Sequence, residues 1–213
     1  MDILHSFASG LCHQLQDRSF QFGGFTFPFC ARCTGVYWGV LSGFIGVCLA
    51  GGGKKSGLPV STMRWVSLLL LVFFPLEVLI EKLFPFSMPL FGRTYISTGF
   101  GISFSIYLIS LFNYFFWYNE RENKPILEKS AVFILILFVS IGIFEFGRFS
   151  ASVVAGYILG ILSVAGAILL YLAINLTIIS SIPWFRRFPR SYLVRILLSL
   201  FLAMGEITLI KIW

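Results

Sequence analysis

The sequence predicts an all-α polytopic membrane protein, in which a six-helix transmembrane bundle follows a short N-terminal Cys/His segment that contains a β-hairpin. The mean hydropathy of the 213-residue chain is +0.91, with 58% hydrophobic and only 12% charged residues. This composition lies outside the range of soluble domains of this size and makes the lipid bilayer the main expected partner. Six apolar stretches are long enough to cross a bilayer. A glycine pair between alternating phenylalanines predicts the hairpin.

The first residues predict a short amphipathic helix. No basic stretch precedes an early apolar core, so a secretory signal peptide is not expected here. A helix over residues 2–16 would carry an apolar stripe on one face and a stripe with His5 and Cys12 on another. His5 is then either a reserve ligand beside Cys12 or an interfacial histidine with no ligand role.

Residues 19–27 form the predicted hairpin, with the glycine pair as its two-residue turn. This turn makes Phe22 face Phe25, and the same register places Asp17 opposite Cys30. The hairpin therefore folds two clusters of Cys and His residues together. Its phenylalanines form an apolar face that is costly in water, so we expect the hairpin to lie against the ends of the spans.

The two clusters contain the candidate metal ligands, namely Cys12, His13, Cys30 and Cys33. Three thiolates and an imidazole complete a tetrahedral zinc site, and a C-x-x-C followed by Gly35 is typical of a metal knuckle. Zinc is therefore the cofactor that this pattern favours. One feature opposes a clean four-ligand site, because neighbours such as Cys12 and His13 point opposite ways in an extended chain.

The same cysteines also allow two other interpretations. Cys30 and Cys33 fit a redox pair, since Cys30 would begin the helix that follows, where the helix dipole activates a thiolate. Buried, inert cysteines are the third interpretation.

The order CHQ, RSF, GG and P-x-CARCTG, followed by a span, resembles the signature of a family of predicted membrane proteins known as domain of unknown function 2085. The resemblance is closest over residues 12–39. Further along, Pro75, Glu77 and residues 93–99 match the family pattern approximately. The resemblance implies a shared site at the four candidate ligands and implies no known reaction.

The chain is predicted to have two parts, a capping segment over residues 1–33 and a transmembrane bundle over 34–213. An even number of spans returns both termini to one side of the membrane. Glycines at four-residue spacing in the first and fifth spans predict close helix packing. The predicted spans are 34–51, 64–84, 97–118, 130–148, 153–179 and 192–213.

Lys and Arg predict the orientation, because the loops after the first, third and fifth spans hold more of them than the other side. By the positive-inside rule those loops face the cytoplasm, so the N-terminus and the Cys/His segment lie outside it, most simply across a bacterial inner or plasma membrane. The net charge of +7 reflects this bias and not a nucleic-acid footprint. Anionic lipid is the expected partner of Arg186, Arg187 and Arg190.

Three glutamates inside the predicted spans are candidate catalytic residues: Glu77, Glu145 and Glu206. Each lies past the midpoint of an even-numbered span, in the membrane half nearer the cysteines. A charge in a span costs roughly 2.5–3.5 kcal/mol on insertion scales, so such residues are expected to face the bundle interior. We expect one outward-facing pocket, capped by the N-terminal segment and floored by Glu77 and Glu206. Pairing of Glu145 with Arg148 is the structural alternative.

Three functions are compatible with these residues. The first is a membrane metalloprotein, and in particular a metalloenzyme whose glutamates act as base or extra ligand. The second is a membrane thiol-disulfide oxidoreductase that uses Cys30 and Cys33. The third is a metal-ion or proton-coupled carrier. No phosphate loop, dinucleotide fingerprint or nucleophile elbow occurs, so the substrate, whether a small molecule or a lipid, stays open.

Overall fold

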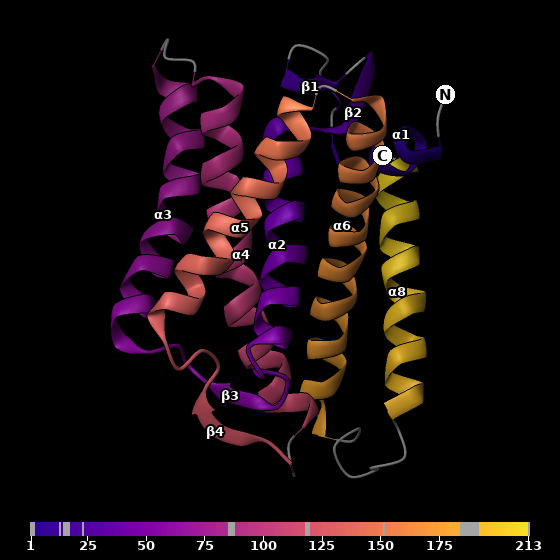
Figure 1. Cartoon of the computed structure of the whole chain (residues 1–213). Coiled ribbons are helices and arrows are strands. Elements are labelled where there is room, and N and C mark those ends of the chain that lie inside the picture. Colours follow the sequence, from indigo (N-terminus) through magenta and orange to yellow (C-terminus); the bar gives the residue numbers. More distant parts are fainter. Residues whose placement is uncertain are drawn as a thin grey trace.

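Six long helices lie side by side in the computed structural model (Figure 1). They are α2 (Ala31–Leu49), α3 (Ser61–Leu83), α4 (Leu90–Phe116), α5 (Ser130–Phe149), α6 (Val153–Ser181) and α8 (Tyr192–Ile212). The short elements are α1 (Ile3–Ala8), β1 (Ser19–Phe22), β2 (Phe25–Cys30), β3 (Lys55–Gly57) and β4 (Glu122–Pro125). The structure describes residues 3–12, 14, 18–22, 24–84, 88–117, 120–150, 152–183 and 192–212.

The predicted fold class is confirmed. Within the described residues, α2 to α6 are each long and apolar enough to cross a membrane. The sixth long helix, α8, has 21 residues and runs beside α6 (Figure 1). Three helices begin earlier than their predicted spans. Helix α3 starts at Ser61. Helix α2 starts at Ala31 and α4 at Leu90, which brings Arg32 and Arg93 into helices. Hydropathy misses these turns because it scores an arginine as unfavourable even where a carboxylate balances it.

Helices α2 and α4 form the centre of the bundle. A Cβ atom on Gly39 would lie 2.4 Å from the carbonyl oxygen of Thr98, and one on Gly35 would lie 2.6 Å from that of Thr94. The glycines of the first span therefore allow the close helix approach that their spacing predicts. Gly156 on α6 differs, because it faces the ring of Phe25 and makes room for the hairpin instead of a helix.

The β1–β2 hairpin docks on one end of the bundle, near α1 and the C-terminal end of α8 (Figure 1). All four of its predicted apolar phenylalanines are buried and pack with Phe144 of α5, Leu159 of α6 and Trp38 of α2. The ring centroids of Phe20 and Phe144 lie 5.4 Å apart. The expected docking of the hairpin on the spans is therefore confirmed, and burial of aromatic surface is its physical cause.

The hairpin register is partly as predicted. Phe22 pairs with Phe25, and Gly24 adopts a φ of +88°, which suits the turn. Cys30, however, pairs with Ser19, so the predicted pairing with Asp17 is wrong. The register shifts within the segment that contains Pro28, which has no N–H to donate to the ladder.

The opposite end of the bundle carries a parallel pair of short strands, β3 and β4 (Figure 1). Asn113, near the end of α4, donates hydrogen bonds to the carbonyl oxygens of Gly52 and Lys55 at 2.9 and 2.8 Å. These bonds fix the loop that joins α2 to α3 on α4, and the pairing of β3 with β4 fixes it to the loop between α4 and α5.

Candidate metal centre

Three cysteines meet beside the hairpin. The Sγ atoms of Cys12, Cys30 and Cys33 all lie within 4.8 Å of one another. Cys30 ends β2 and directly precedes α2, and Cys33 lies in the first turn of that helix. Zinc–sulfur bonds of about 2.3 Å place the sulfurs of a tetrahedral site about 3.8 Å apart. The three thiols thus need only a small contraction to bind one ion.

Cys12 reaches this cluster by a turn after α1, which ends at Ala8 and is shorter than the helix predicted over residues 2–16. Its N–H donates to the carbonyl oxygen of Ala8 at 3.0 Å. His13 itself lies outside the described residues.

Helix α1 is held on β2 by polar contacts. His5 Nε2 lies 2.9 Å from the carbonyl oxygen of Thr26. The side chain of Gln14 donates to the carbonyl oxygens of His5 and Pro28 at 2.7 and 3.2 Å. Gln14 has a φ of +47°, an uncommon conformation that these two bonds help to maintain. His5 therefore has a structural contact, and the cysteine cluster does not include it.

The thiols of the cluster lie close enough to bond to one another. The backbone N–H of Cys30 donates to the Sγ of Cys12 at 3.3 Å. Hydrogen bonds from the thiols of Cys30 and then Cys33 lower the pKa of Cys12 to about 2. In turn, the bonded sulfur of Cys12 raises the pKa of Cys30. The cluster thus carries one negative charge readily, and a divalent cation would allow further thiolates to form.

The surroundings of the cluster are apolar. Cys12 is buried with Ala8, Phe29, Tyr37 and residues of α6. Cys30 and Cys33 are half-buried beside these residues. A site with mostly apolar surroundings is more typical of structural metal sites than of open catalytic ones.

Four charged side chains link the C-x-x-C segment at the start of α2 to α3 and α4. We call Arg32, Glu77, Glu81 and Arg93 the Arg32 ion cluster. Arg32 donates from Nε and Nη2 to both carboxylate oxygens of Glu77, at 3.1 and 2.8 Å, and from Nη2 to Glu81 at 2.5 Å. Arg93 in turn donates to Glu81 at 3.0 Å. The two positive charges of the arginines balance the two negative charges of the glutamates, and such pairing is how a membrane bundle tolerates buried charges.

This ion cluster fixes the segment that carries Cys30 and Cys33. Arg32 lies between the two cysteines in sequence, and Thr94 of α4 donates to the carbonyl oxygen of the adjacent Ala31 at 3.2 Å. The side chain of Glu77 is only 5% exposed. Sequence reasoning missed this role of Arg32 and Glu81. A signal was present, because Glu77 and Glu81 are four residues apart and so share one helix face.

The three candidate glutamates do not meet in one pocket. Glu145 accepts hydrogen bonds from Tyr95 of α4 and from Arg148, as the structural alternative predicted. Glu206 on α8 accepts from Asn175 on α6 at 3.0 Å. Glu77 and Glu206 therefore lie on different helices with different partners, on the α3 and α8 sides of the bundle (Figure 1). The expected shared floor is not formed, because each carboxylate is satisfied by the nearest donor on a neighbouring helix.

The three arginines predicted to contact anionic lipid, Arg186, Arg187 and Arg190, lie outside the described residues.

The fold and the site define a multi-pass membrane protein with a three-cysteine cluster at the end of the bundle that carries the hairpin. Residues 12–108 match the model of the family described as "Predicted membrane protein (DUF2085)", the family that the sequence signature resembles. The matched range contains the three cysteines and the whole Arg32 ion cluster.

The chain is also similar to an uncharacterized protein of Methanothermobacter thermautotrophicus, with 46% identity over 35 residues. The similar segment covers 16% of this chain and 32% of that relative, so the chain spans about a third of the relative's length. No solved structure matches the chain.

Proposed function

We propose that this membrane protein binds one zinc ion through the thiolates of Cys12, Cys30 and Cys33, with His13 as the fourth ligand. The observation that carries the proposal is the mutual approach of three sulfurs from two separate chain segments. The N–H of Cys30 adds a hydrogen bond to sulfur of the kind that stabilises a thiolate. Cys12 follows α1 while the other two begin α2, so the ion would fasten the N-terminal segment to the bundle.

A structural role for the ion is better supported than catalysis. Glu77 and Glu145 are each held by an arginine, so their geometry favours charge balance over the role of a general base. If the site does catalyse a reaction, Glu206 is the stronger candidate for a base, because the contact of its carboxylate is a neutral amide, that of Asn175.

Thiol-disulfide exchange by Cys30 and Cys33 is the second candidate. It is favoured by the position of Cys30 at the N-cap of α2, where the helix dipole stabilises a thiolate. A redox pair needs only two cysteines, so it does not account for the third sulfur, that of Cys12, which lies within 4.8 Å of both.

Elemental analysis of detergent-purified protein, with a thiol count under denaturing conditions, distinguishes the two. We expect one zinc per chain and four free thiols, one of them from Cys48. Protein that lacks metal and contains a Cys30–Cys33 disulfide would instead support the redox function.

We further propose that the hairpin end of the bundle faces away from the cytoplasm. The β3–β4 end is the one rich in lysine, with Lys54, Lys55, Lys124 and Lys129. The positive-inside rule assigns such loops to the cytoplasm.

Reporter fusions test this topology. A reporter at the C-terminus and one inserted beside Arg121, in the loop between α4 and α5, are expected to report opposite compartments. If both reporters are active in the same compartment, the topology is wrong.

A further inference from the structure

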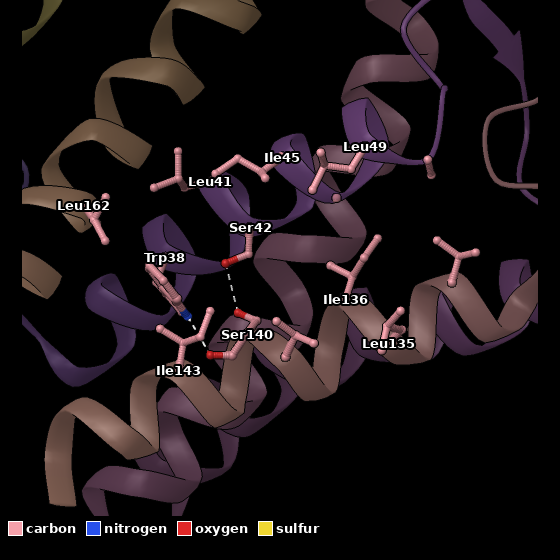
Figure 2. A pocket seen from close by; sticks show the side chains of 14 residues that line it. Trp38, Leu41, Ser42, Ile45, Leu49, Leu135, Ile136, Ser140, Ile143 and Leu162 are labelled. Atoms are coloured by element: carbon pink, nitrogen blue, oxygen red, sulfur yellow. Dashed lines mark hydrogen bonds between the residues drawn. The ribbon is translucent and has the colours of Figure 1, made fainter. Parts of the chain in front are cut away.

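A groove separates α2 from α5 in the membrane-spanning part of the bundle. Its volume is about 470 Å³, within the range of about 300–1,000 Å³ found for pockets that bind small ligands. Figure 2 shows that its walls are built mainly from aliphatic side chains, among them Leu41, Ile45 and Ile136.

Two hydrogen bonds at Ser140 join α5 to α2. Trp38 donates from Nε1 to the carbonyl oxygen of Ser140 at 3.0 Å, and the hydroxyl of Ser140 donates to that of Ser42 at 3.0 Å (Figure 2). The indole N–H and the two serine hydroxyls of the groove wall thus bond within the wall. An occupant would therefore meet apolar surface along most of the groove.

The two ends of the groove differ. Trp38 is buried at one end, where it packs with the phenylalanines of the hairpin and with Leu162. At the other end Leu49 is 84% exposed, so the groove is open there. From Trp38 to Ala50 the groove follows α2 for about 18 Å at ~1.5 Å per residue. This length is close to one leaflet of hydrocarbon, which is about 15 Å thick.

A positive charge lies next to the open end. Lys129 precedes α5, is exposed, and accepts at its carbonyl oxygen a hydrogen bond from the N–H of Val132, which lines the groove. The lysine is thus one helical turn from the groove wall, at the level where the span ends. An anionic group at this level would be attracted to it.

We infer that this groove binds one acyl chain of an anionic glycerophospholipid. The chain lies along α2 and α5 with its end near Trp38, and the phosphate group lies near Lys129, in the leaflet at the β3–β4 end. The site does not involve the cysteines, so it is independent of the proposed zinc ion.

The full-length protein in phosphatidylcholine vesicles tests this site with phosphatidylglycerol that carries a diazirine at the end of one acyl chain. After irradiation, the label is expected on peptides of α2 and α5 near Trp38 and Ile143. Val139→Trp should lower this labelling at least fivefold, because the larger side chain fills the groove. Val72→Trp is the matched control on α3 and should leave it unchanged, since Val139 and Val72 are 50% and 62% exposed.

A second pair of variants tests the head group and does not depend on the folding of Val139→Trp. Lys129→Gln should lower the preference for phosphatidylglycerol over a phosphatidylcholine probe about fivefold, the factor expected for one surface charge. Lys124→Gln, also exposed at this end, should leave the preference intact. Equal labelling of α3 and of the groove would mean ordinary surrounding lipid and would overturn the inference. The inference would also be overturned if the parent protein proves dimeric in detergent and Val139→Trp is monomeric with labelling unchanged, because a second copy of the chain would then fill the groove.

Discussion

Replacing Cys30 by serine is expected to release the metal and to destabilise the N-terminal segment. The loss of one thiolate should weaken zinc binding by more than about 100-fold, since supporting contacts alone contribute 10–100-fold. The double variant Cys12→Ser/Cys30→Ser should lose metal and thermal stability to nearly the same extent as the single variant. Ligands of one ion act as a unit, so their effects are not additive. Zinc content and melting temperature in detergent are the measurements.

Cys48→Ser provides the matched control for this experiment. Cys48 lies on the same helix as Cys33 but is exposed and is not part of the cluster. Its replacement should leave metal content and stability unchanged. A Cys30→Ser protein that retains a full equivalent of zinc, or a double variant whose losses add, would contradict a shared site.

Glu77→Gln is expected to destabilise the protein by about 3 kcal/mol. Breaking a buried ion pair by removing one partner typically costs roughly 3–5 kcal/mol, because a charge is left without compensation. The lower end is expected here, since Glu81 still accepts from Arg32. The free energy of unfolding, measured by titration with a denaturing detergent, checks the change. Zinc affinity should also fall about 10–100-fold, as for other supporting contacts of a metal site.

Two further variants show whether charge balance is the cause. Glu128→Gln removes a carboxylate that pairs with Lys55 at the protein surface, so it should leave the free energy of unfolding nearly unchanged. Arg32→Met combined with Glu77→Met removes both charges and leaves Glu81 paired with Arg93. This double variant should recover at least half of the stability lost in Glu77→Gln. If it is less stable than Glu77→Gln, charge balance does not explain the effect of Glu77.

The membrane helices, the hairpin turn and the start of α2 could be predicted from the sequence, because each depends on residues close together in the chain or on transfer of apolar residues into lipid. The long apolar runs predict the membrane helices, since transfer into the bilayer depends on composition and length. The glycine pair predicts the turn between Phe22 and Phe25, and Cys30 stands at the start of a helix as the C-x-x-C pattern suggests. Local geometry fixes each of these without reference to the rest of the chain.

Other features were decided only by packing between distant segments. The pairing of Ser19 with Cys30 depends on the irregular ladder around Pro28 and on the docked phenylalanines. The route of Cys12 into the cluster depends on α1 resting on β2.

The sequence by itself thus determined that the chain is a multi-pass helical membrane protein with a cysteine-rich, hairpin-containing cap. Only the tertiary structure decided which charges meet, since Arg32 and its partner Glu77 are 45 positions apart. It also separated Glu145 and Glu206 from that cluster and opened the groove between α2 and α5. The physical reason is that a helix period fixes which residues share a face, whereas the partner of that face depends on how rigid helices pack against one another.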